Sequence, residues 1–264
     1  MRVLILGGTS DARKVVKALD QQGLLDHITL TYSVAGLVRV PELACEVISG
    51  GFSQRGGLLH YLQEHSFDLV LDITHPFALQ MSTTAVEACA EKGIPCWRFH
   101  RPVWQAQEGD IWRLFDDWSA LLAATEAYQS LFLTAGQIGQ TLIDQLAQQN
   151  LKTGQRQVLR TAAPPQADLP ASMKWLKAIG PFNQTDEKNI LETYKIDLLI
   201  SKNSGGSATE AKLWAARELG IPVFMLQRPM LPDADQLMDS VEGVVDAVSS
   251  LRVDSGMRGQ KIEG

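Results

Sequence analysis

Short runs of apolar residues alternate along the chain with longer stretches whose apolar residues recur every three to four positions. Continuous runs are typical of strands buried on both faces of a parallel sheet, and the longer spacing is typical of helices. The first run, Val3 to Leu6, is followed by two glycines and by a helical face of Ala12, Val15, Val16 and Leu19. Because strands and helices alternate with short connections, the pattern predicts an α/β fold with parallel sheets. Further strands are expected at residues 28–33, 46–48, 67–73, 94–99, 111–115, 131–134, 157–161, 197–201 and 222–226, and a last helix at 235–251.

A second glycine turn, Gly136-x-x-Gly139, follows the apolar run at residues 131–134 and leads into another helical stretch. Two α/β halves of similar size, each beginning with a strand, a glycine turn and a helix, predict two parallel-sheet domains with a cleft between them. The expected bounds are 1–129 for the first domain, 130–251 for the second, and 252–264 for a polar, flexible tail.

Composition and charge are those of an ordinary globular protein. The 264 residues are 45% hydrophobic and 20% charged, and no apolar run approaches the roughly 18 residues of a membrane-spanning helix. The formal net charge of −6 argues against a nucleic-acid partner, which would favour a basic excess. Three cysteines without metal-type spacing, and an apolar strand where a signal peptide would stand, predict a cytoplasmic protein without a metal site or a membrane partner.

The turn at residues 7–13 is the first candidate binding site. Gly7 and Gly8 allow a close approach of the backbone, and the N-terminus of the following helix presents free N–H groups, where anions bind. The hydroxyl groups of Thr9 and Ser10 can donate to the same anion. Since the third glycine of G-x-G-x-x-G is missing, two interpretations stay open: a phosphate site, or a structural turn capped by Ser10 or Asp11.

Two candidate groups follow later strands of the first half. His75 comes after the strand at 67–73, where an imidazole could act as a general acid or base, bind a carboxylate, or bridge loop carbonyls. Arg98, His100 and Arg101 come at the end of the next strand, beside aromatic residues. Arginine matches carboxylates bidentately, so this cluster suits a polyanionic ligand, although salt bridges between domains would explain it equally well.

The remaining groups follow the strands at 197–201 and 28–33. A lysine, two polar residues and two glycines lead into a helix and form a second candidate anion site: Lys202, Asn203, Ser204, Gly205 and Gly206. The lysine precedes the glycines, so this is not a P-loop. After residues 28–33 no acid is available for the ribose of NAD, whereas Arg39 can bind the 2′-phosphate of NADP or can be a solvated loop arginine. The motifs G-x-S-x-G and H-E-x-x-H do not occur in the sequence.

Together these groups resemble one family, the precorrin-6A reductases, which include the cobalt-precorrin-6A reductases of the anaerobic cobalamin route. The matching stretches occur in the family's order: Gly7–Arg13, Ala35–Gly36, Gly50–Phe52, Asp72–Ala78, Arg101–Trp104, Gly180–Phe182, Lys202–Gly206, Ala215–Gly220 and Arg228–Pro229. Each stretch is modest alone, but the ordered set is specific. The chain departs from the family's pattern at Ser53 and Gln54, where glycines are usual, and at Leu37, where many members have arginine.

The resemblance implies two Rossmann-like domains with a nicotinamide cofactor in the cleft. The implied reaction is hydride transfer from NADPH, or NADH, to a double bond of precorrin-6A or cobalt-precorrin-6A, a tetrapyrrole with many carboxylates, giving the 6B form. Handover of the tetrapyrrole to neighbouring cobalamin-pathway enzymes is a further expectation. The alternative is a non-catalytic Rossmann module that senses a dinucleotide or binds a partner.

Each candidate residue then has an expected role. Catalysis is assigned to His75 and Lys202. Cofactor binding is assigned to Gly7, Gly8, Thr9, Ser10, Arg13, Ser33, Ala35, Gly36, Arg39 and Thr74. Substrate binding is assigned to Arg98, His100, Arg101, Lys202, Asn203, Ser204 and Gly205. Because Arg39 is available and no acid is near it, we expect a shallow preference for NADPH.

Overall fold

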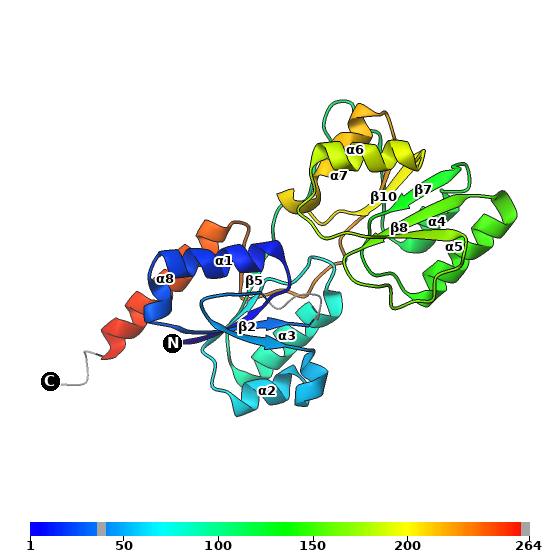
Figure 1. Ribbon diagram of the computed structural model, residues 1–264. Helices are drawn as coiled ribbons and strands as arrows, with labels where there is room; N and C mark the ends of the chain where they lie inside the picture. Colours follow the sequence, from blue (N-terminus) through cyan, green and yellow to red (C-terminus); the bar gives the residue numbers. More distant parts are fainter. Residues whose placement is uncertain (36–40, 260–264) are drawn as a thin grey trace. The chain divides into compact units, whose positions relative to one another are not determined.

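The computed structural model describes residues 1–35 and 41–259 (Figure 1). The chain forms two compact units, Met1–Pro102 with Met230–Gly264, and Val103–Pro229. Each unit contains a six-stranded sheet, and every strand pair in both sheets is parallel. The predicted fold class of two parallel-sheet α/β domains is therefore confirmed.

The first sheet has the strand order β12-β5-β4-β1-β2-β3. Its strands are β1 (Arg2–Leu6), β2 (Thr29–Val34), β3 (Glu46–Ser49), β4 (Leu69–Asp72), β5 (Cys96–Phe99) and β12 (Gln236–Met238). Its helices are α1 (Ser10–Gln21), α2 (Leu58–Glu64), α3 (Leu79–Lys92) and α8 (Val241–Gly259), with short 3-10 helices at Leu24–Asp26 and Phe52–Arg55.

The apolar run of β1 explains why this sheet is covered on both faces. Successive side chains of a strand point to opposite faces. Val3 and Ile5 accordingly pack in the core formed with α1 and α8, whereas Leu4 and Leu6 pack in the core formed with α2 and α3. In Figure 1, α1 and α8 lie next to each other, in agreement with their contacts.

The second sheet has the order β6-β11-β10-β7-β8-β9. Its strands are β6 (Trp112–Phe115), β7 (Ser130–Leu133), β8 (Arg156–Thr161), β9 (Met173–Lys177), β10 (Leu198–Lys202) and β11 (Val223–Leu226). Its helices are α4 (Trp118–Ala123), α5 (Gln140–Thr153), α6 (Gln184–Thr193) and α7 (Ala211–Glu218), with a 3-10 helix at Ser207–Thr209. Leu191 of α6 and Leu213 of α7 pack on Leu199 and Met225 of the sheet.

The unit boundaries differ from those expected at 129 and 130. β6 and α4 precede residue 129, but β6 pairs with β11 of the second sheet. β12 lies near the end of the chain, but it pairs with β5 of the first sheet. Both are short edge strands, and their sequence does not indicate which sheet they join. The chain therefore crosses between the units twice, at 102–103 and at 229–230.

The expected tail at 252–264 also differs from the structure. Helix α8 continues to Gly259, and residues 260–264 lie outside the described residues. No helix in the described part of the chain is both long and apolar enough to span a bilayer.

Candidate functional site

The turn after β1 requires glycine at two positions. Gly8 has a φ of +98°, which residues with side chains rarely adopt. A Cβ atom on Gly7 would lie 2.3 Å from Cζ of Tyr32, whose ring is fully buried. The Tyr32 hydroxyl accepts a hydrogen bond of 2.8 Å from the Gly8 N–H, and the Gly7 N–H donates to the Ser33 carbonyl at 2.9 Å. Both glycine N–H groups thus have partners within the protein.

Two hydroxyl groups predicted to bind the cofactor are also engaged. Thr9 is the N-cap of α1, and its Oγ1 accepts from the Ala12 N–H at 3.1 Å. The same hydroxyl donates to the Ile73 carbonyl at 2.9 Å. The Ser33 hydroxyl donates to the Ile5 carbonyl at 3.1 Å. Thr9 and Ser33 therefore shape the turn, because both hydroxyl groups donate to carbonyls of the protein.

The first turn of α1 keeps donors for an anion. The N–H groups of Ser10 and Asp11 have no partner within the helix, and the helix dipole favours negative charge beside them. Arg13 lies near the Tyr32 hydroxyl, where its charge acts to lower the pKa of the phenol while burial, the larger effect, raises it. Gly8 leaves open space, since an added Cβ atom would meet only the Val34 Cγ2 atom, at 4.0 Å. These features fit a diphosphate.

Asp11 places a carboxylate in the same turn. Its Oδ2 atom lies 2.5 Å from Nη1 of Arg101, and its Oδ1 atom lies 3.6 Å from Nζ of Lys14. Arg101, which was predicted to bind substrate, therefore forms an ion pair at the N-terminus of α1. Because both cations offset the Asp11 charge, the turn can accept a phosphate that an unpaired carboxylate would repel.

Arg98 and Thr74 donate hydrogen bonds to Asp72 at the end of β4. Asp72 Oδ2 accepts from Arg98 Nε at 2.9 Å, and Asp72 Oδ1 accepts from the Thr74 N–H and hydroxyl at 3.2 and 2.6 Å. Arg98 Nη1 also donates to the Pro232 carbonyl at 2.5 Å. Arg98 is only 4% exposed, and its Nε atom is engaged in this ion pair within one unit. Its Nη2 atom is buried without a partner among the described residues.

His75 and His100, the two histidines predicted at the site, form different kinds of hydrogen bond. His75 is exposed at the end of β4, and its Nδ1 atom accepts from the Phe77 N–H at 3.2 Å, which leaves the ring proton on Nε2 in the neutral imidazole. The His100 N–H donates to the Met238 carbonyl at 2.7 Å and helps to join β5 to β12.

In the second unit, the loop after β10 is held by two residues that lie far away in the sequence. Asn203 Oδ1 accepts from the Trp104 N–H at 2.9 Å, and its Nδ2 atom donates to the Trp104 carbonyl at 3.3 Å. Arg228 donates from Nε and Nη2 to the carbonyls of Asn203 and Ser204. Gly205 has a φ of +65°, and the Gly206 carbonyl accepts from Trp104 Nε1. The predicted anion loop thus uses the Asn203 side chain for its own shape.

One lysine ends β10 and a second lies on α7. Lys202 is half-buried at the strand end, and burial lowers its pKa. Lys212 of α7 is buried, and burial together with the Arg160 charge lowers its pKa to about 7, against an opposing effect of Glu187. Lys212 Nζ lies 5.1 Å from the centre of a Trp104 ring.

The sequence did not assign a role at the site to Tyr32, Trp104, Lys212 or Arg228. Tyr32 is the aromatic residue of its strand, and Trp104 and Arg228 stand in matching stretches, so each had a weak signal. The contact of Trp104 with Asn203 spans about a hundred residues and had none. Gly36 and Arg39, both assigned to the cofactor, lie outside the described residues, whereas Ala35 is exposed just after β2.

Comparison with known proteins finds relatives that match nearly the whole length of the chain. The family model described as "Precorrin-6x reductase CbiJ/CobK" matches residues 2–249. The chain is 38% identical to precorrin-6A reductase of Rhodococcus erythropolis, over 95% of this chain and 98% of the relative. It belongs to the precorrin-6x reductase family. A solved structure named CobK precorrin-6A reductase has 34% identity and a TM-score of 0.82, covering 95% of this chain and 96% of the other.

Membership of the precorrin-6x reductase family makes the chain an oxidoreductase of cobalamin biosynthesis. The family implies a tetrapyrrole substrate and a nicotinamide cofactor, which supplies the hydride. The N-terminus of α1 fits the diphosphate of such a cofactor, because its N–H groups, Arg13 and the open space at Gly8 converge there.

Proposed function

We propose that this protein reduces precorrin-6A without cobalt, using NADPH in preference to NADH. The observation that carries the substrate proposal is the difference in identity between two groups of relatives. The chain is 37% identical to the precorrin-6A reductase of Rhodobacter capsulatus over 92% of its length. It is 23% identical to the cobalt-precorrin-6A reductase of Methanocaldococcus jannaschii over 96%.

The cofactor would be held at the N-terminus of α1. The N–H groups of Ser10 and Asp11 and the guanidinium of Arg13 would bind the diphosphate, while Gly8 leaves room for it. The preference for NADPH rests on β2, whose residues include no carboxylate for a ribose diol. Arg39, outside the described residues, would bind the 2′-phosphate.

Lys202 would supply the proton that completes the reduction. Burial lowers the pKa of its ammonium group, which makes the group a better acid near neutral pH. His75, exposed at the end of β4 with the ring proton on Nε2, would contact the substrate or take this role instead. Lys202→Met should then lower kcat at least a hundredfold and leave NADPH affinity unchanged, whereas His75→Ala should act mainly on KM. The reverse result would exchange the two roles.

The experiment that tests the function measures oxidation of NADPH and of NADH with precorrin-6A and with cobalt-precorrin-6A. We expect kcat/KM to be highest for NADPH with precorrin-6A. A preference for the cobalt form would contradict the substrate proposal. Tight NADPH binding without oxidation in any mixture would favour a non-catalytic dinucleotide module.

We further propose that the protein works in the cytoplasm and passes its product to the next enzyme of the pathway. Three unpaired cysteines, Cys45, Cys89 and Cys96, support a reducing compartment. Cell fractionation tests the location in the cytoplasm. Release of the reduced tetrapyrrole into solution, before the next enzyme is added, would contradict direct transfer of the product.

A further inference from the structure

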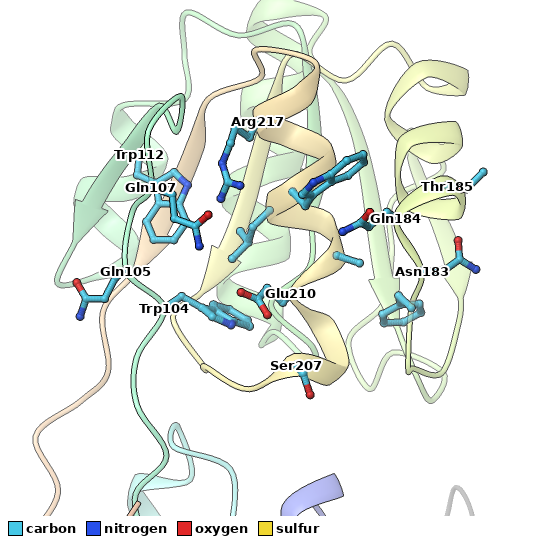
Figure 2. Close-up of a pocket in the computed structure, with 14 residues that line it drawn as sticks. Trp104, Gln105, Gln107, Trp112, Asn183, Gln184, Thr185, Ser207, Glu210 and Arg217 are labelled. Atoms are coloured by element: carbon cyan, nitrogen blue, oxygen red, sulfur yellow. The ribbon is translucent and has the colours of Figure 1, made fainter.

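A pocket in the second unit is lined in part by Trp104, the residue that also holds the loop after β10. It encloses about 640 Å³, within the usual range of small-molecule sites. Figure 2 shows its sides: the segment from Trp104 to Trp112, helix α7, and residues 182–185. Within the described part of the chain, no residue assigned here to the cofactor, substrate or catalysis lines this pocket.

Aromatic rings form much of the pocket wall. They belong to Trp104, Trp112, Phe182 and Trp214, and Trp214 on α7 is 36% exposed. Lys212 already lies over Trp104, and Arg160 lies over Phe182 at 4.0 Å from the ring centre. The rings of Trp112 and Trp214 are therefore the ones left for a ligand. Aromatic faces stack on flat apolar groups and attract cations.

The lining has one charged residue of each sign, and only the negative charge is uncompensated. Its charged residues are Arg217 and Glu210. Arg217 donates from Nε and Nη2 to both carboxylate oxygens of Asp110, at 2.9 and 3.1 Å, and its charge is thereby offset. Glu210 is exposed, and no hydrogen bond or ion pair of its carboxylate occurs among residues 1–35 and 41–259. The pocket therefore combines aromatic rings with one uncompensated negative charge.

This combination does not suit the substrate of the reductase. A polycarboxylate would be repelled by Glu210 and would find no unpaired cation in the described lining. We propose that the pocket binds an organic cation, an ammonium or guanidinium group attached to a flat apolar body. Glu210 would pair with the cation, the rings of Trp112 and Trp214 would cover the apolar body, and the amides of Gln107 and Gln184 would accept its remaining N–H groups.

The test uses three probes that share one ring and differ in charge: benzylammonium, benzyl alcohol and benzoate. Each is titrated into the full chain, and binding is followed by calorimetry and by tryptophan fluorescence. We expect benzylammonium to bind at least tenfold more tightly than benzyl alcohol, and benzoate not to bind. Trp214→Leu should weaken the binding of benzylammonium and benzyl alcohol alike, because it removes a ring from the wall.

Glu210→Gln should abolish the preference for the cation. Glu126→Gln makes the same charge change at an exposed residue of the same unit outside the pocket, and it should keep the preference. Equal binding of the three probes, no binding of benzylammonium, or an unchanged preference in Glu210→Gln would overturn the proposal. These assays need no turnover, so their outcome is independent of the reductase assay, in which Glu210→Gln should retain activity.

Discussion

Each unit contains the same pattern of strand, glycine turn and helix, β1 with α1 in the first and β7 with α5 in the second. The two turns differ in what surrounds the helix N-terminus. In the first unit, α1 begins beside charged groups, with Asp11 paired to Arg101 and Lys14. In the second, α5 begins beside neutral amides. Gln137 donates to the carbonyls of Ala163 and Pro164, and Gln140 exchanges hydrogen bonds with Asp168.

The side chains of Gln137 and Gln140 therefore hold residues 163–168 against the second turn. In the first turn, the N–H groups of Ser10 and Asp11 stay available for a ligand. The shared sequence pattern predicts the backbone geometry of both turns. Which turn binds an anion depends on side chains outside the pattern.

The largest expected effects concern buried charges. In the first unit, Arg98→Met leaves Asp72 buried without its ion-pair partner, and the free energy of unfolding should fall by about 3–5 kcal/mol. In the second unit, Lys212→Met removes a buried cation without an ion pair among the described residues, and it should stabilise the protein at pH 7. Urea denaturation measures the free energy of unfolding of both variants. A similar loss of stability in Arg98→Met and Lys212→Met would contradict the predicted difference.

The pH dependence of Lys212 sharpens this comparison. Its pKa is lowered from 10.5 to about 7, so the unfolded chain binds more protons than the folded protein between these values. Stability should therefore rise with pH across this window, by roughly 3–5 kcal/mol in total. Lys212→Met should remove this rise, which is measured by comparing wild type and variant at pH 7 and pH 10.

The next largest effect is a change in stability when a glycine of either turn is replaced by alanine. Gly7→Ala would place Cβ against the buried ring of Tyr32, and we expect a loss of about 1–3 kcal/mol in stability. At Gly139, where φ is −76°, an added Cβ atom meets nothing within 4 Å among the described residues. Gly139→Ala should change stability by less than about 0.5 kcal/mol. Equal losses in thermal denaturation would show that the two turns have the same steric demands.

Replacing Arg101 should have a smaller effect, on the affinity for NADPH. Arg101→Ala leaves the Asp11 carboxylate less compensated at the N-terminus of α1, and NADPH affinity should fall about five- to tenfold, or roughly 1–1.4 kcal/mol. Asp11→Asn in the same chain should restore it, and Gln140→Ala in the second unit should leave it unchanged. A fluorescence titration measures all three. If only KM for precorrin-6A changes, Arg101 binds substrate as the sequence predicted.

The smallest effect concerns cofactor choice. Arg39→Ala should reduce the ratio of kcat/KM for NADPH over NADH, since one charge-assisted hydrogen bond is lost. Leu37→Arg should raise the same ratio. A wild-type enzyme that favours NADH would contradict this assignment.

The sequence predicted the order of most elements because buried strands and amphipathic helices have distinct spacings of apolar residues. It did not predict the unit boundaries. Residues 236–238 were expected to be helical but form the strand β12, and the pairing of the short strands β6 and β12 depends on distant strands. At the candidate site, the glycine turn was predicted from residue types. The partners of Arg98 and Asn203 were not, because Asp72 and Trp104 meet them only in the folded chain.

The two crossings of the chain also matter during synthesis on the ribosome. When residues 1–102 have emerged, the first sheet lacks β12, and the apolar face that Val244, Val245 and Val248 later cover is open. Exposed strand edges and apolar faces of this kind favour aggregation of incomplete chains. A nascent chain that stops before Met230 would therefore depend on chaperones, and truncation at the C-terminus would damage the unit that contains the N-terminus.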